Sequence, residues 1–326
     1  MAAAHTRLTP AASAAFLEKC ARTASSTQSR FYYPCNAKDG EPQTCTFALR
    51  CRQSTQVIEI VVAECSYSSG GTGWRVWPCA LLLACWLCAH MDSRPRRVLE
   101  VGCGLGLPAL TAAAIMRRPG EATLSDCLPQ LLATCRLNVA ANRGGTAAAG
   151  SARVALLDWD DEAPVEAAET FSTEQGVKAA QLAAVAEGGA AEGGAAERLA
   201  SDERFDLLLA TDVIYSMTHA RQLPRVIAGR MARGGELCAM VPVRDEAHTR
   251  CFLRGLGESG LCVSVARVDE AWVSRCVAPQ RDGPRAEDGP EAEAAEAGLD
   301  LRGEGLVPWA AERPLAEGDI YFVVAR

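Results

Sequence analysis

The sequence predicts an α/β fold in which a mostly parallel, doubly wound sheet carries helices on both faces. Three observations predict it. Strand-like and helix-like segments alternate along the chain from residue 98 onward. The run FDLLLAT at residues 205–211 is almost wholly apolar, which is typical of a parallel strand buried on both faces. The stretch VLEVGCGLGLP at residues 98–108 joins a short strand to a helix through three glycines, as nucleotide-binding turns do.

The individual elements follow in the order that such a sheet requires. Strands are expected at residues 98–101, 122–125, 154–157, 205–211, 236–241, 261–268 and 320–324. Helices are expected between them at residues 107–117, 129–141, 220–231 and 246–259. Upstream, residues 78–90 predict a helix that begins at a proline, and residues 44–62 predict a small β-hairpin at the edge of the domain. Ligands of such a sheet bind at the carboxyl ends of the strands.

The folded domain is expected at residues 44–326. Residues 1–43 are expected to form a disordered tail or an organelle transit peptide, because the start of the chain is rich in Ala, Ser and Thr and its charged groups are mostly basic. Residues 160–203 and 281–304 are rich in Ala, Gly and Glu and are expected to be low-complexity inserts. They carry net charges of −9 and −5, so the remaining chain carries about +7.

Composition excludes several classes of protein. The longest apolar run, near residues 80–89, is shorter than the ~20 residues that span a bilayer, and the first residues lack a secretory signal. We therefore expect a protein of the cytoplasm, the nucleus or both that acts without a membrane. The 15 cysteines are scattered, and Cys85–Cys88 is the one C-x-x-C pair. No histidine cluster completes a zinc set, so free thiols and no metal are expected.

The glycine loop at residues 102–106 discriminates between two nucleotide cofactors. A dinucleotide site needs G-x-G-x-x-G, but Gly102, Gly104 and Gly106 are spaced G-x-G-x-G. A carboxylate at Glu100 also disfavours a nearby pyrophosphate, whereas it suits the cationic end of a sulfonium amino acid. These features favour S-adenosylmethionine over a nicotinamide dinucleotide. The alternative is that the glycines serve only the turn.

Polar residues follow the next two strands. Asp126 ends the second strand, where an acid can accept both ribose hydroxyls of an adenosine, a feature that the two cofactors share. Asp158 and Trp159 end the third strand, where a carboxylate and an indole can meet the edge and face of adenine. The alternative for this second pair is a loop acid beside a buried tryptophan.

The strand at residues 205–211 ends in the candidate acceptor site. Asp212 and Tyr215 follow it three residues apart, so one turn can direct both side chains into one cleft. A carboxylate there can hold an incoming amine and help to take its proton, and a phenol can orient it. The alternative is that Asp212 caps the helix that follows.

Several motifs together resemble one family. They are Trp77-Pro78-Cys79-Ala80, VLEVGCGLGLPAL, TLSDCLPQLLATCRLNVAAN with Asn138 and Asn142, LLDW, and FDLLLATDVIY. This set is similar to methyltransferase family 16, a branch of the class I S-adenosylmethionine enzymes that contains many protein-lysine methyltransferases and a relative that acts on histone arginine. The resemblance covers roughly residues 44–268 and the last strand. It implies a Rossmann-like, three-layer sandwich with seven strands, the last of them antiparallel.

The resemblance also implies roles for individual positions. Trp77 would line the cofactor pocket, and Thr211 would pack on the cofactor. The amino acid part of the cofactor would be contacted by Glu100, Gly102, Cys103 and Gly104. Asp126 would hold the ribose, Asp158 and Trp159 the adenine, and Asp212 and Tyr215 would form the acceptor site. The two acidic inserts depart from the family's compact pattern and leave the choice of substrate open.

The sequence therefore predicts a methyltransferase that uses S-adenosylmethionine to methylate a protein side-chain nitrogen, with lysine first and arginine second. A guanidinium favours a pair of gripping carboxylates, and the site shows one aspartate, which is why arginine is second. A non-catalytic scaffold that keeps the fold and a nicotinamide oxidoreductase are the rivals from other classes. The expected partner is a protein substrate, without nucleic acid or membrane, and the expected state is a monomer.

Overall fold

The computed structural model describes residues 5–8, 44–51, 57–65, 70–94, 96–143, 149–162, 197–269, 272, 306–310 and 315–326. The insert predicted at 281–304 lies outside them, as does most of the tail predicted at 1–43. Within that tail the structure describes one strand, β1 (His5–Leu8), which pairs in parallel with β2 (Thr44–Arg50). β2 pairs antiparallel with β3 (Val57–Ala63), which is the predicted hairpin.

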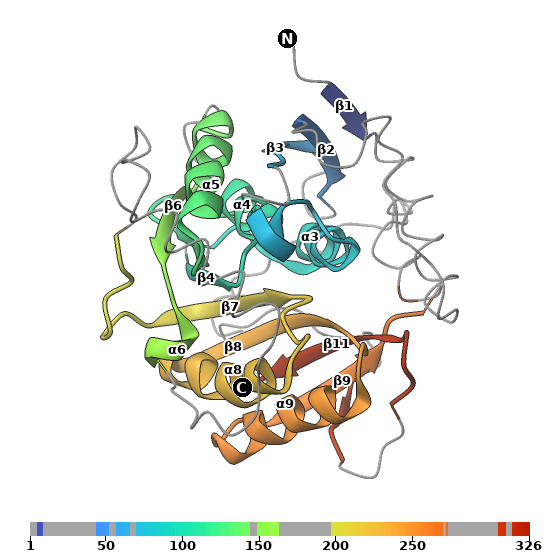
Figure 1. Ribbon diagram of the computed structural model, residues 1–326. Coiled ribbons are helices and arrows are strands. Elements are labelled where there is room, and N and C mark those ends of the chain that lie inside the picture. Colours follow the sequence, from blue (N-terminus) through green and yellow to red (C-terminus); the bar gives the residue numbers. More distant parts are fainter. Residues whose placement is uncertain are drawn as a thin grey trace, which may run out of the picture.

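Among the described residues, an eight-stranded sheet forms the centre of the molecule, in the order β10-β9-β11-β8-β7-β4-β5-β6 (Figure 1). Its members are β4 (Arg97–Val101), β5 (Glu121–Asp126), β6 (Ser151–Leu156), β7 (Phe205–Thr211), β8 (Met231–Pro242), β9 (Val263–Arg267), β10 (Val307–Pro308) and β11 (Ile320–Ala325). Strands β4 to β8 run parallel, and β11 lies antiparallel between β8 and β9. The predicted fold class is confirmed, and the two-residue strand β10 is added at one edge.

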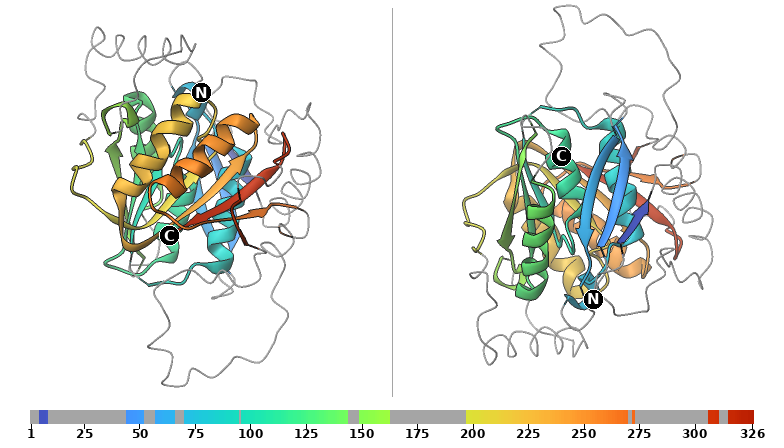
Figure 2. Two further views of the ribbon diagram at one scale, coloured as in Figure 1. Left: turned by 90° about the horizontal axis from the view of Figure 1, so that it is seen from below. Right: turned by 90° about the horizontal axis from the view of Figure 1, so that it is seen from above.

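Helices cover both faces of this sheet, so the molecule has three layers (Figures 1 and 2). One face carries α3 (Pro78–His90), α4 (Leu107–Ile115) and α5 (Pro129–Ala141), and the other carries α8 (Met217–Arg230) and α9 (Glu246–Glu258). The short helix α6 (Trp159–Glu162) follows β6. Within the described part of the chain, no helix is both long enough and apolar enough to cross a membrane.

The apolar run of β7 supplies side chains to two separate cores. Leu207 and Leu209 pack into the core under α3, α4 and α5, whereas Leu208 and Ala210 pack into the core under α8 and α9. All four are fully buried. This is the two-sided burial that the uninterrupted apolar pattern predicted, because successive side chains of a strand point to opposite faces.

Two asparagines, Asn138 of α5 and Asn142 directly after that helix, tie the small sheet to the domain. The side-chain amide of Asn138 accepts a hydrogen bond from the N–H of Ala63 (2.7 Å) and donates one to its carbonyl (3.3 Å). Asn142 makes the same pair of bonds with Val61, at 2.9 and 2.7 Å. These residues lie on the free edge of β3, so the two amides satisfy backbone groups that would otherwise be unpaired.

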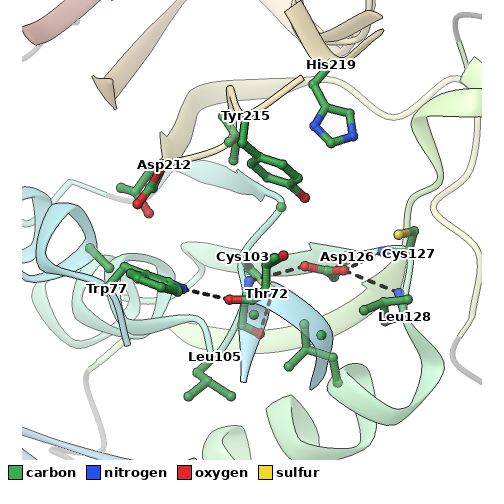
Figure 3. A pocket seen from close by; sticks show the side chains of 18 of the residues that line it. Thr72, Trp77, Cys103, Leu105, Asp126, Cys127, Leu128, Asp212, Tyr215 and His219 are labelled. Atoms are coloured by element: carbon green, nitrogen blue, oxygen red, sulfur yellow. Dashed lines mark hydrogen bonds between the residues drawn. The ribbon is translucent and has the colours of Figure 1, made fainter. Parts of the chain in front are cut away.

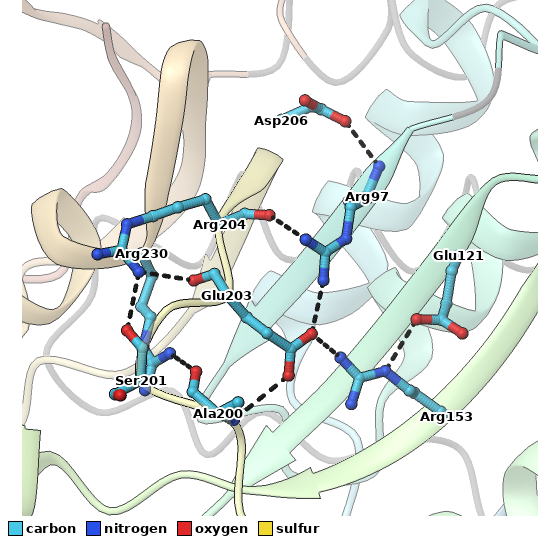
Figure 4. A network of polar contacts seen from close by, with 9 residues as sticks. All are labelled: Arg97, Glu121, Arg153, Ala200, Ser201, Glu203, Arg204, Asp206 and Arg230. Carbon is cyan, nitrogen blue, oxygen red and sulfur yellow. Dashed lines mark hydrogen bonds and ion pairs between the residues drawn. The ribbon is translucent and has the colours of Figure 1, made fainter.

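Both ends of the segment at 160–203 belong to the folded domain, although its middle lies outside the described residues. At the first end, Glu162 pairs with the buried Arg230 of α8 at 2.6 Å. At the second end, Glu203 accepts from Arg153 of β6 at 2.6 Å, within the network drawn in Figure 4. The composition of this segment did not predict these contacts, because each of them involves an arginine that is far away in the sequence.

Candidate active site

A cavity of about 350 Å³ lies at the carboxyl ends of β4, β5, β6 and β7 (Figure 3). This is the edge at which ligands of such sheets bind, and the size is within the ~300–1,000 Å³ of small-molecule sites. The short 3-10 helix η1 (Gly71–Gly73) and the start of α3 also line the cavity. Ten predicted site residues line it, namely Trp77, Gly102, Cys103, Gly104, Asp126, Asp158, Trp159, Thr211, Asp212 and Tyr215.

The glycine loop forms one wall of the cavity with its bare backbone. Gly102, Gly104 and Gly106 have φ values of +64°, +52° and +81°, which side chains rarely adopt. A Cβ at Gly102 would lie 3.0 Å from the ring of Trp159, and one at Gly106 would lie 2.1 Å from Leu124. The positive φ values favour glycine at all three positions, and at Gly102 and Gly106 a side chain would also lack space. Without side chains at these glycines, the backbone of this loop can come close to a ligand in the cavity.

Asp126 stands at the end of β5 with its carboxylate fixed by backbone donors. Oδ1 accepts from the N–H groups of Cys127 (2.8 Å) and Leu128 (3.3 Å), and Oδ2 accepts from the N–H of Gly104 at 3.3 Å. Burial raises the pKa of this carboxyl, and the backbone donors oppose that rise. A carboxylate oxygen can accept two hydrogen bonds, so Oδ2 can still receive a hydroxyl from a ligand.

Trp159 opens α6 and connects the glycine loop to α8. Its ring packs against Gly102 and meets the ring of His219 edge-on, with centroids 5.3 Å apart. Beside it, Asp160 accepts a hydrogen bond of 2.7 Å from the buried side chain of Gln222. These contacts with α8 hold the first turn of α6 against the cavity. The indole and the neighbouring Asp158 both line it, as predicted.

Asp212 and Tyr215 enter the cavity from the segment after β7. Asp212 has a left-handed backbone, with φ +55°, and its N–H donates to the carbonyl of Met240 at 3.1 Å. The ring of Tyr215 meets the ring of His219 edge-on, with centroids 4.4 Å apart (Figure 3). Helix α8 is capped instead by Ser216, which accepts from the N–H of His219. The alternative that Asp212 is a helix cap is therefore wrong.

Several residues that line the cavity were not predicted from the sequence, among them Arg244, His219 and Gln222. The guanidinium of Arg244 donates to both carboxylate oxygens of Asp212, at 2.8 and 2.6 Å, and stands over the ring of Trp77. Arg244 follows β8 at the same sheet edge, and the other two lie on the helix after β7. The positions of these three residues shortly after β7 and β8 were the one signal in the sequence that they line the cavity, because they belong to no motif.

Glu100 departs from its predicted role. Its carboxyl group is fully buried and does not line the cavity. Oε2 accepts from the N–H of Ala109 at 2.9 Å, so the side chain satisfies a free donor at the start of α4. Burial raises the pKa of Glu100 to about 8. The Glu100 side chain thus contacts α4, and it does not line the cavity as a direct contact with the cofactor would require.

Cys103 lines the cavity as a protonated thiol. Its Sγ lies 3.8 Å from the Sγ of Cys135, and burial raises its pKa well above the usual value. The Cys135 thiol also donates to the carbonyl of Gly104 at 3.0 Å, so the two sulfurs lie against the glycine loop. Within the described stretches, no group of three or more His, Cys, Asp or Glu side chains is arranged to hold a metal ion.

The sequence of this region matches known proteins. Residues 57–174 match the family described as lysine methyltransferase, which confirms over these residues the resemblance predicted from the motifs. The chain is 39% identical over 87 residues to the histone-arginine methyltransferase METTL23 of Xenopus laevis, and 44% identical over 64 residues to that of Homo sapiens. These alignments cover 26% and 19% of this chain. The chain spans about a third of the length of these relatives, 34% and 32% respectively.

The solved structures that align with this chain are more distant in sequence. A precorrin-6y C5,15-methyltransferase from Geobacter metallireducens aligns with a TM-score of 0.37 and 12% identity, over 76% of this chain and 86% of that one. A ribosomal protein L11 methylase from Lactobacillus delbrueckii subsp. bulgaricus aligns with a TM-score of 0.36 and 12% identity, over 76% and 77%.

Proposed function

We propose that this chain, whose residues 57–174 match the lysine methyltransferase family, uses S-adenosylmethionine to methylate a side-chain nitrogen of a protein. The observation that carries the proposal is that one cavity joins the glycine loop and Asp126 to Asp212 and Tyr215. A transfer between two substrates needs a nucleoside site and an acceptor site that open into each other. This cavity supplies residues suited to both.

The cofactor side of the cavity fits S-adenosylmethionine by its chemistry. Asp126 is fixed in place with capacity left on Oδ2, which suits a ribose hydroxyl. The ring of Trp159 offers adenine a flat face, with Asp158 beside it. A side chain at Gly102 would fill the space between the loop and that ring. The remaining contacts would fall to Trp77, Cys103, Gly104 and Thr211. The bound cofactor would supply a methyl group on a cationic sulfur.

On the acceptor side, Asp212 and Tyr215 would receive the nitrogen. An amine reaches the protein as a cation and reacts only when neutral, so a carboxylate both attracts it and helps to take its proton. The phenol of Tyr215 would orient the nitrogen toward the methyl group. Most of the rate would come from holding the two reactants in line, because the donor is already reactive.

Lysine is the first candidate acceptor, in keeping with the description of the matching family. Arginine is the second, and one observation favours it. Asp212 already binds a guanidinium through both of its oxygens, that of Arg244. The relatives named histone-arginine methyltransferase add support for this candidate. Histones are nuclear and basic, so a nuclear location suits either acceptor. A monomeric state and the absence of nucleic acid from the reaction stay predictions.

The proposal is tested by methyl transfer into cell extract. Purified full-length protein is incubated with extract and S-adenosylmethionine that carries a trideuterated methyl group, and the proteins are analysed by mass spectrometry. We expect trideuteromethyl groups on lysine. Labelled arginine without labelled lysine would select the second candidate. Absence of label from every protein would overturn the assignment of a protein acceptor.

Two variants assign the transfer to this cavity. Asp212→Asn removes the carboxylate and should lower the rate about a hundredfold, a typical contribution of a general base. Asp319→Asn is the matched control, since Asp319 is equally buried and pairs with Arg267 away from the cavity. It should leave the rate unchanged. Equal rates for the two variants would contradict the acceptor role of Asp212.

A further inference from the structure

Arg244 holds the acceptor carboxylate in the structure. Its Nε donates to Oδ1 of Asp212 at 2.8 Å and its Nη2 donates to Oδ2 at 2.6 Å, so both oxygens face one guanidinium. The same group stands over the ring of Trp77, with Cζ 5.8 Å from the ring centroid. The hydrogen bonds to Asp212 raise the pKa of Arg244, which stays charged. This is the fork-to-carboxylate geometry in which arginine binds most specifically.

The two partners differ in their freedom to move. The side chain of Asp212 is 9% exposed, and its backbone is fixed by the bond to Met240. The side chain of Arg244 is 46% exposed, so its charged end can turn into water while its stem stays in place. Because the guanidinium is half exposed, water can replace the contacts that Arg244 loses when it leaves the carboxylate. If one member of the pair leaves, it is Arg244.

We propose that Arg244 occupies the acceptor subsite of the free protein and is displaced by the cationic side chain that is to be methylated. The inference rests on the proposed function in one respect, which is the assignment of Asp212 as the acceptor's carboxylate. An incoming ammonium or guanidinium needs the oxygens that Arg244 now binds. Arg244 is thus an internal competitor that lowers the affinity for every acceptor. It also keeps the buried charge of Asp212 paired while the subsite lacks its substrate.

The consequence is an affinity threshold that every acceptor must exceed. A side chain enters only if its own cation and the contacts of its flanking chain together bind more favourably than the guanidinium of Arg244, which is part of the same chain as Asp212. A free amine of low affinity is rejected by this competition, whereas a side chain presented by a docked protein is accepted. Because the competition weakens every acceptor by the same factor, Arg244 sets the affinity that an acceptor must reach, and it takes no part in the transfer itself.

The test uses ethylguanidinium as the probe and compares three full-length proteins saturated with S-adenosylmethionine. Calorimetric titration should show the probe binding Arg244→Met about fivefold tighter than wild type, the factor expected when a half-exposed ion pair stops competing. Arg267→Met is the matched control, because Arg267 is 57% exposed and pairs with the buried Asp319 outside the cavity. It should bind the probe as wild type does. Equal or weaker binding by Arg244→Met would overturn the inference.

A second measurement needs no variant. Arginine Nε–Hε correlation spectra of wild-type protein are recorded during the same titration. The Arg244 signal should move from a hydrogen-bonded position to that of a free side chain as the probe binds. A bound probe with an unchanged Arg244 signal would overturn the inference. Failure of S-adenosylmethionine to bind any of the three proteins would instead count against the proposed function, so the two failures can be told apart.

Discussion

The carboxyl group that precedes the glycine loop can face a ligand or the core, and in this protein it faces the core. Glu100 receives the N–H of Ala109 on Oε2, while its Oε1 lacks a hydrogen-bond partner among the described residues. Burial in an apolar strand disfavours the charged form. At neutral pH the group is therefore mostly protonated, with a pKa of about 8.

This burial predicts how stability changes with pH. A carboxyl whose pKa is raised on folding keeps its proton in the folded state and loses it in the unfolded state, between about pH 4.5 and 8. Stability is complete below that window and falls as pH rises through it. Glu100→Gln removes the titration. From pH 5.5 to pH 7.5, its free energy of unfolding should gain about 1–3 kcal/mol relative to wild type.

Urea unfolding at the two pH values measures this gain. Glu317→Gln is the control, because Glu317 is exposed at a turn. Its stability should keep the same difference from wild type at both pH values. A Glu100→Gln difference that is equally constant would show that Glu100 is ionised in the folded protein.

At the scale of elements, α5 replaces a missing neighbour strand. Asn138 is fully buried and bonds both backbone groups of Ala63, and its Nδ2 also donates to the carbonyl of Leu105 at 3.1 Å. The glycine loop, α5 and the small sheet thus meet at one side chain. The sequence analysis noted the spacing of Asn138 and Asn142 as part of a resemblance. The structure gives that spacing a physical cause, since one helical turn matches two residues of an edge strand.

Asn138→Ala should lower the free energy of unfolding by about 2–4 kcal/mol, because it leaves buried backbone groups unpaired. Leu137→Ala on the same helix is the control. Leu137 is 65% exposed, so its change should stay within about 0.5 kcal/mol. Urea denaturation compares the two. In hydrogen exchange, the Ala63 amide should lose protection in the first variant alone. Similar stability of both variants would show that the asparagine bonds contribute little.

At the scale of the whole molecule, the sheet and one half of the cavity could be predicted from the sequence. Apolar periodicity located the strands, and the polar residues at their carboxyl ends then share one edge by topology. That logic placed Asp126, Trp159 and Asp212 correctly around the cavity. The glycine spacing likewise anticipated a turn that requires left-handed backbone at all three glycines.

The features that could not be predicted depend on contacts between segments that are distant in the sequence. Arg244 follows a strand as an ordinary surface arginine would, and its partner lies 32 residues away. The direction in which the Glu100 side chain points depends on how α4 packs on β4, and the spacing of residues in the sequence does not specify that packing. Arg230, the last residue of α8, binds the start of the acidic segment, so composition alone could not reveal where the folded domain ends there.

Whether this cavity holds S-adenosylmethionine is tested most directly by calorimetric titration of the full chain with that compound and with NADH. We expect saturable binding of S-adenosylmethionine and no binding of NADH. This assignment also predicts binding at least about tenfold weaker in Asp126→Asn, which can keep the Oδ1 bonds to Cys127 and Leu128 but has an NH2 group in place of Oδ2 and loses the ribose-binding charge. Tight binding of NADH, or S-adenosylmethionine binding that Asp126→Asn leaves unchanged, would contradict it.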